Sequence, residues 1–282
     1  MRILLILGAL IAGQILAFVP PVTSILKDIF DSRKISDGTE FAFSYQILNT
    51  GGDAVEIEER ILVDSSGLKF LWKVGPQGSW LTGKLEKRAY IVGVEQKIPA
   101  RSLLFLKYFV SKTAVEFRDA LVNERFLRWE QLKQYKDGFE LQGDPQTWEI
   151  KKNYVQQDSV FFALLPSGPS LAVVGHQDSS SKKTFYLDKD SLTVKRFDWA
   201  DSVENLTWNL GSSSLEFKGA IFPKSAVFSK NGKELINAEL VVIRQLNKKQ
   251  LKEWLQLWQR TNGFRGAATT SEDNLRTLLS NR

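Results

Sequence analysis

Residues 41–74 read FAFSYQILNTGGDAVEIEERILVDSSGLKFLWKV. Apolar side chains recur with a period of two in three runs, which Gly51-Gly52 and the Ser-Ser-Gly at 65–67 separate. The alternating residues are Phe41, Phe43, Tyr45, Ile47, Val55, Ile57, Ile61, Val63, Leu68, Phe70, Trp72 and Val74. Since successive side chains of a strand point to opposite faces, this pattern predicts an antiparallel meander with one apolar and one polar face.

A second turn signal lies late in the chain, in FPKSAVFSKNGKELINAELVVI at 222–243. Asn231 and Gly232 both tolerate the positive φ of a type I′ turn, so they predict a two-residue hairpin between two alternating strands. Further apolar runs between 147 and 219 have strand character. The whole chain therefore predicts roughly ten to twelve strands and a mainly β fold of the α+β class.

Three segments have helical periodicity, at 22–33, 99–128 and 248–260, and the middle one has a break near 111–113. The apolar face of the meander must be covered. We therefore expect a strongly curved antiparallel sheet with the first helix and the 99–128 insertion against its concave face. The insertion is either a mobile lid or a fixed cover. The mostly polar residues 264–282 are expected to form a frayed tail.

The N-terminus has the features of a secretory signal peptide. Arg2 precedes an apolar run over 3–16, and Ala17 is a small residue at the expected cleavage position. We expect loss of residues 1–17, export to the periplasm and a single domain over 18–263. A retained anchor is the less favoured alternative, because the run is shorter than a typical spanning helix. The chain has no cysteine, so it forms no disulfide and carries no N-terminal lipidated Cys.

The charge balance is mildly basic, with 38 Lys and Arg against 32 Asp and Glu and a net charge of +6. Such a balance suits anionic membrane surfaces or acidic ligands. No basic run is long enough to indicate nucleic-acid binding.

Few residues offer catalytic or metal-binding chemistry. His176 is the single histidine and cysteine is absent, which argues against a zinc site. No G-x-S-x-G elbow is present to supply a nucleophile for His176. Glu58 and Glu59 are neighbours, so on a strand they point to opposite faces and cannot act as a carboxylate pair. We therefore expect a protein that is not an enzyme and that has no metal site and no cofactor.

One cluster favours a different function. Trp199 and Trp208 lie near Asp198, Asp201 and Glu204, a combination typical of a carbohydrate site. A carbohydrate-binding or carbohydrate-active envelope protein is therefore an alternative, although charged residues around a turn more often form a solvated loop.

The 18 Phe and 8 Trp point instead to an apolar interior. These residues form either an ordinary core or, if part of the sheet face is uncovered, a cavity for acyl chains, which gain about 0.8 kcal/mol per buried CH₂. We expect this cavity to have no charged residue in its wall. The residues expected to line it are Phe43, Tyr45, Ile57, Ile61, Phe70, Trp72, Leu104, Phe105 and Tyr108.

The order of these segments resembles the outer-membrane lipoprotein carrier superfamily, the LolA/LolB-like proteins. The similarity lies in VTSILKDIF at 22–30, FAFSY at 41–45, KIPARSLLF at 97–105 and KGAIFPKSAVFSKNGKEL at 218–235. The resemblance implies an incomplete β-barrel wrapped around helices, with an apolar cavity for the acyl chains of lipoproteins. The absent N-terminal Cys fits a soluble carrier.

This chain lacks the Arg-Pro and Phe-Arg-Trp stretches that are typical of the superfamily. No individual functional residue is therefore carried over. The resemblance implies a periplasmic carrier or sensor of lipid or lipoprotein acyl chains, with membrane transport proteins as further partners. A related regulator of envelope stress that binds a protein partner is the remaining alternative.

Overall fold

The computed structural model describes residues 22–281 apart from 49–53, 94–95, 127, 130–131, 136–137, 142–159, 162, 168–169, 178–180, 189–192 and 261–268. Side chains are described for these residues except at 22–25, 128–182, 201 and 269–272. The expected signal peptide at 1–17 and the expected strand at 147–155 lie outside the described residues.

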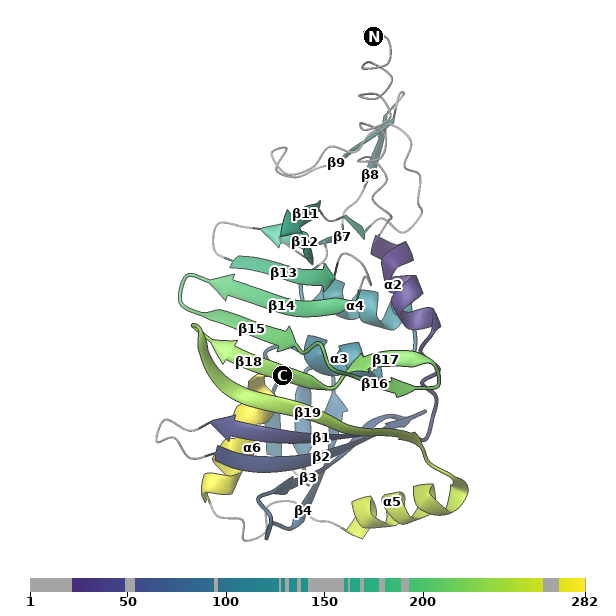
Figure 1. The fold of residues 1–282 in the computed structure, drawn as a ribbon, viewed down its shortest axis with the longest axis vertical. Helices are drawn as coiled ribbons and strands as arrows, with labels where there is room; N and C mark the ends of the chain where they lie inside the picture. Colours follow the sequence, from purple (N-terminus) through teal and green to yellow (C-terminus); the bar gives the residue numbers. More distant parts are fainter. Residues whose placement is uncertain are drawn as a thin grey trace.

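A large antiparallel sheet dominates the described residues (Figure 1). Its thirteen strands follow the order β11-β12-β13-β14-β15-β18-β19-β1-β2-β3-β4-β5-β6. The strands are β1 Thr39–Leu48, β2 Ala54–Asp64, β3 Gly67–Val74, β4 Trp80–Glu86, β5 Ala89–Val92, β6 Gln96–Pro99, β11 Ala163–Ser167, β12 Ser170–Gln177, β13 Ser181–Asp188, β14 Val194–Asp201, β15 Asn205–Leu210, β18 Ser225–Lys230 and β19 Lys233–Gln245. In this part of the chain the edge strands β6 and β11 do not pair with each other, so the curved sheet is an incomplete barrel, as expected.

Three two-stranded ribbons accompany the main sheet. They are β7 Arg128–Trp129 with β10 Val160–Phe161, β8 Leu132–Tyr135 with β9 Gly138–Leu141, and β16 Ser214–Phe217 with β17 Ala220–Pro223. The predicted hairpin turn is confirmed, because Asn231 and Gly232 connect β18 to β19 with φ of 52° and 78°.

The strands β1 and β19, which come first and last in the sequence, are neighbours in the main sheet. Strand β1 pairs with β2 on one side and with β19 on the other, so that Thr39 lies opposite both Val63 and Gln245. The predicted meander and the predicted late hairpin are thereby joined into one continuous surface.

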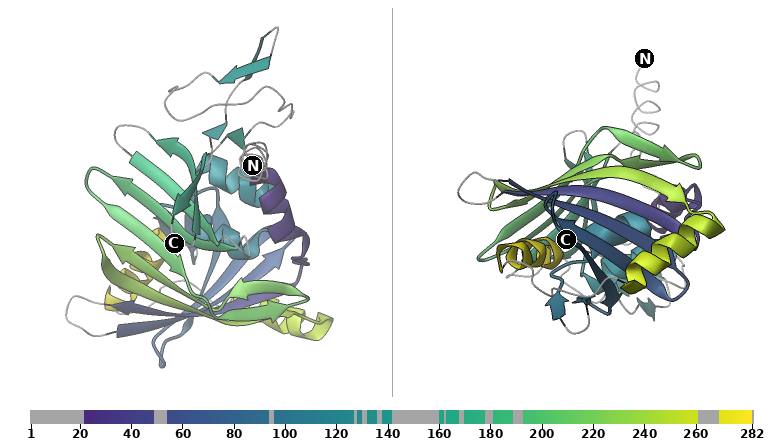
Figure 2. Two further views of the ribbon diagram at one scale, coloured as in Figure 1. Left: turned by 45° about the horizontal axis from the view of Figure 1, so that its top comes forward. Right: turned by 90° about the horizontal axis from the view of Figure 1, so that it is seen from below.

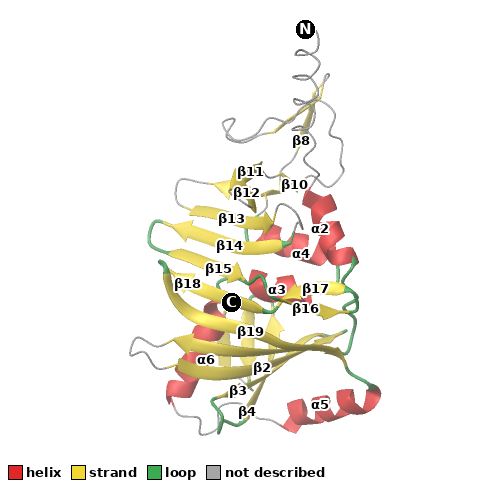
Figure 3. Cartoon of the chain, in the orientation of Figure 1, coloured by secondary structure: helices red, strands yellow, loops and turns green. Residues whose placement is uncertain are grey.

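Helices cover the concave face of this surface (Figures 2 and 3). They are α2 Val22–Asp31, α3 Leu104–Val110 and α4 Ala114–Asn123. Helix α4 packs against both α2 and α3. The break between α3 and α4 falls at 111–113, where the sequence indicated it. The Thr113 side chain accepts a hydrogen bond from the Glu116 N–H and so caps α4.

The expectation of a frayed polar tail is wrong for residues 269–281. They form helix α6, Thr269–Asn281, which lies against β1, β3 and β6. Leu275, Leu278 and Leu279 are fully buried in the main core. These three leucines follow helical spacing, so α6 presents one apolar stripe to the sheet although most of its residues are polar.

The predicted helix at 248–260 is present as α5, Lys248–Arg260, and it packs on the opposite, convex face. Leu62, Leu71 and Trp254 form a small second core beneath it. The Trp254 indole N–H donates to the buried carboxylate of Glu40 at 3.0 Å, and Arg60 and Arg244 also bind this carboxylate. Within the described residues no helix is long and apolar enough to cross a bilayer.

Candidate functional site

The nine residues that the sequence predicted as cavity lining lie together in one core. Phe43, Tyr45, Ile57, Ile61, Phe70 and Trp72 come from the concave face of β1–β3, and Leu104, Phe105 and Tyr108 come from α3. Each is at most 2% exposed. Parity along the strands therefore identified the inward face correctly.

Helix α3 fills the space in front of these strands. Six of its seven residues are buried. The ring centroid of Phe43 lies 6.0 Å from that of Phe105 and 5.1 Å from that of Phe109. On the other side, Phe105 stacks on Trp208 of β15 at 4.0 Å. The helix thus contacts both β1 and β15 of the curved sheet and occupies the place expected for a ligand.

Sequence reasoning missed Phe109 and Trp208 as members of this interior. Phe109 lies four residues after Phe105, so helical spacing could have found it. Trp208 was instead assigned to a carbohydrate cluster, and nothing in the sequence shows that β15 faces α3.

The expectation of a wall without charged residues is wrong at Glu59. This side chain is fully buried on the concave face of β2. Its carboxylate accepts hydrogen bonds from the Tyr45 hydroxyl at 2.9 Å and from the Trp72 indole N–H at 2.6 Å. Glu59 has the same parity as Ile57 and Ile61, so the sequence carried the signal. A buried polar group is tolerated because these donors replace its hydration.

Arg33 is a second ionisable group in the interior, just after α2. Its guanidinium carbon lies 4.4 Å from the ring centroids of Phe30 and Tyr108 and 4.6 Å from that of Phe222. Its Nη1 donates to the Tyr108 carbonyl on α3. Burial lowers the pKa of the Arg33 guanidinium. No acidic side chain among the described residues forms an ion pair with it, so the aromatic faces and one carbonyl hold this cation.

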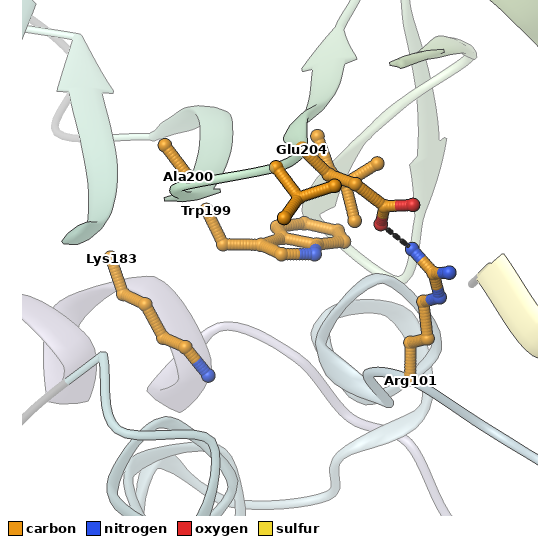
Figure 4. A pocket seen from close by; sticks show the side chains of 7 residues that line it. Arg101, Lys183, Trp199, Ala200 and Glu204 are labelled. Carbon is orange, nitrogen blue, oxygen red and sulfur yellow. Dashed lines mark hydrogen bonds and ion pairs between the residues drawn. The ribbon is translucent and has the colours of Figure 1, made fainter. Parts of the chain in front are cut away.

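A pocket of about 420 Å³ opens at the side of this interior (Figure 4). We call it the Trp199 pocket. It is lined by Arg101, Lys183, Trp199, Ala200, Val203, Glu204 and Leu206. Arg101 lies three residues before α3, and its backbone N–H donates to the Ser280 carbonyl of α6 at 2.9 Å. The pocket therefore adjoins the ends of two helices that cover the interior.

The carbohydrate cluster predicted from the sequence is not assembled. Trp199 and Glu204 line the Trp199 pocket, but Trp208 is buried against Phe105. Asp198 precedes Trp199 on β14 and so points to the opposite face, where its Oδ2 lies 3.1 Å from Nη2 of Arg196. The side chain of Asp201 lies outside those described.

The carboxylate of Glu204 is also engaged. Hydrogen bonds from Lys230 and Arg101 lower its pKa. A general acid requires a raised pKa, so Glu204 does not fit that role.

Metal binding finds no support in the described residues, which contain no cluster of three or more His, Cys, Asp and Glu side chains. The side chain of His176, on β12, lies outside those described. Glu58 and Glu59 point to opposite faces of β2, one exposed and one buried, so they do not form a carboxylate pair.

A comparison of the sequence with protein-family models finds no match, and neither does a search of curated proteins. Solved structures with a similar course of the chain are found. A domain described as that of an outer membrane lipoprotein-sorting protein from Vibrio parahaemolyticus has a TM-score of 0.45 and 8% identity, covering 83% of this chain and 97% of that domain. A DUF1329 family protein from Desulfovibrio piger has a TM-score of 0.38 and 10% identity, covering 83% and 96%.

Proposed function

We propose that this protein binds acyl chains of a lipid or lipoprotein in its aromatic interior, without catalysing a reaction, and that it carries or senses them in the periplasm. One observation carries the proposal. The concave face of an open sheet is lined by apolar and aromatic side chains, and the short helix α3 fills the space before it.

Helix α3 is suited to giving way to a ligand. It has seven residues, and Leu103 at its N-cap provides no side-chain hydrogen bond. A helix this short is not stable alone and depends on packing. An acyl chain that replaces α3 against Phe43 buries apolar surface of its own, which offsets part of the cost of displacing the helix.

The apolar character of the site determines its selectivity. Burial of CH₂ groups contributes about 0.8 kcal/mol each and has no directional preference. We therefore propose that the interior accepts acyl chains of varied length. The sequence resemblance to LolA/LolB-like proteins favours lipoprotein acyl chains as natural ligands, and the signal-peptide features of residues 1–17 favour a periplasmic location.

Native mass spectrometry of the full chain, purified without detergent and then mixed with a long-chain fatty acid, tests the proposal. We expect a complex of one protein with bound fatty acid. Quenching of tryptophan fluorescence by a brominated fatty acid provides a second readout, since Trp72 and Trp208 lie in the interior. A folded protein that shows neither signal at saturating fatty acid would contradict acyl binding.

A further inference from the structure

We propose that the Trp199 pocket binds the anionic head of the ligand, a phosphate or carboxylate linked to the acyl chain. This inference rests on the proposed function, because the chain itself would lie in the aromatic interior.

Two cationic side chains line the pocket from different elements. Arg101 precedes α3, and Lys183 lies on β13. Figure 4 shows them on opposite sides of the Trp199 indole. The Arg101 guanidinium donates a hydrogen bond to the Glu204 carboxylate. An Arg fork offers several parallel N–H donors, so Arg101 can bind a phosphate or carboxylate while it contacts Glu204.

The charges around the pocket favour an anion. Among the described residues that line the pocket, Arg101 and Lys183 are cationic and Glu204 is acidic. The Lys183 ammonium also donates to the backbone carbonyl of Glu124 at 2.8 Å. Two cations and one carboxylate give this described lining a net positive charge. Such an excess attracts an anionic ligand and strengthens its binding.

An aromatic path connects the pocket with the interior. The Trp199 ring lies 6.2 Å from both Phe126 and Phe228, measured between ring centroids. Phe228 in turn lies 5.2 Å from Trp208, which stacks on Phe105 of α3. A row of packed aromatic rings therefore runs from the Trp199 pocket to α3.

Head binding also acts on the segment that must move. Arg101 is separated from α3 by only two residues, and the N–H of Leu103 donates to the Glu124 carboxylate at 3.4 Å. An anion bound to Arg101 thus contacts the short segment that precedes α3 and positions its first residue. This arrangement links recognition of the head to displacement of the helix.

The test compares two lipids with identical short acyl chains, an anionic phosphatidylglycerol and the neutral diacylglycerol that lacks the phosphate, by calorimetric titration of the full chain. We expect the anionic lipid to bind about tenfold more tightly at low salt, as one charged hydrogen bond implies. Lys183→Gln and Arg101→Gln should each remove most of this preference by weakening binding of the anionic lipid. Lys183→Arg should restore it. Lys252→Gln, a matched charge change on the exposed side of α5, should have no effect.

The outcomes separate this inference from the proposed function. Equal binding of both lipids, unaffected by either variant, overturns the head site and leaves acyl binding intact. Failure of both lipids to bind a folded protein overturns acyl binding and the head site together. Inorganic phosphate serves as the third ligand. Tight binding of phosphate that depends on Lys183, without any preference between the lipids, would show a free-anion site and overturn the assignment to a lipid head. Circular dichroism establishes that each variant is folded.

Discussion

The ring of Phe105 on α3 stacks on the indole of Trp208 on β15, with centroids 4.0 Å apart and planes inclined by 18°. This contact fixes the helix to β15, which β18 and β19 separate from β1 in the sheet. Phe105→Ala should lower the free energy of unfolding by about 3–5 kcal/mol. Because α3 and the ligand compete for one space, the same change should increase the affinity for a fluorescent fatty acid.

Urea denaturation and fatty-acid titration measure these two effects. Val115→Ala, on an exposed position of α4, is the control and should change neither. A parallel loss of stability and of affinity in Phe105→Ala would show that α3 forms part of the bound state.

The opposite result is expected at the sheet wall. Phe70 is fully buried and stacks on Trp72 at 5.2 Å. Phe70→Glu places a carboxylate without a partner in the wall, at a cost of several kcal/mol. We expect loss of fatty-acid binding, measured by fluorescence titration alongside circular dichroism. Ile221→Glu introduces the same group at an exposed position and should bind normally. If Phe70→Glu unfolds the chain, the milder Phe70→Leu should still weaken binding.

The buried carboxylate of Glu59 is expected to stabilise the interior. Glu59→Leu removes the acceptor for the Tyr45 hydroxyl and the Trp72 N–H. Loss of a partner inside a core costs about 1–3 kcal/mol per group, so urea denaturation should show a clear decrease. Glu58→Leu, the exposed neighbour on the other face, provides the matched control. Equal stability of the two variants would mean that Glu59 is not needed as an acceptor.

Acid stability should depend in part on Asp64. A hydrogen bond from Lys69 is the main cause that lowers the Asp64 pKa from 3.8 to about 2. A lowered pKa in the folded state stabilises the protein above pH 3.8, and this stabilisation is lost as the pH falls through about 2. Lys69→Met should raise the Asp64 pKa toward 3.8, as measured by NMR titration. Lys73→Met on the same strand should leave it unchanged. A pKa that stays near 2 in Lys69→Met would exclude Lys69 as the cause.

Helix α6 is expected to contribute to folding. Leu278 is fully buried, and Leu278→Ala should lower the free energy of unfolding by about 2–5 kcal/mol. Asp273→Ala, exposed on the same helix, should change it by no more than about 0.5 kcal/mol. Thermal or urea unfolding distinguishes the two. A leucine variant as stable as the aspartate variant would support the frayed tail that the composition first suggested.

The sequence predicted the parts of the fold that follow from local periodicity. Alternation placed Phe43, Ile57 and Phe70 on one face, and Asn231-Gly232 specified a turn through backbone conformation alone. The break between α3 and α4 was also predicted near 111–113, where Thr113 is a residue type that favours a helix N-cap. Each of these features depends on neighbours within a few residues.

Features that depend on distant contacts were not predictable in the same way. The period of two shows which way Trp208 points from its strand but not that Phe105 lies opposite. The three leucines of α6 were overlooked because the average polarity of 264–282 concealed their spacing. The expectation of a wall without charges overlooked Glu59, although it shares the parity of Ile57 and Ile61, and its neighbours Tyr45 and Trp72 explain why a carboxylate is tolerated there.

The pairing of β1 with β19 determines when the fold can be completed. Thr39 and Gln245 are 206 residues apart in the sequence, yet a side-chain hydrogen bond joins them where β1 begins and β19 ends. Contacts of such long range slow folding, because a large loop must close before they form. While the chain emerges, one edge of β1 stays unpaired until β19 arrives, and an unpaired edge can recruit strands from other chains. A factor that holds this edge in the nascent chain should therefore increase the yield of the native protein.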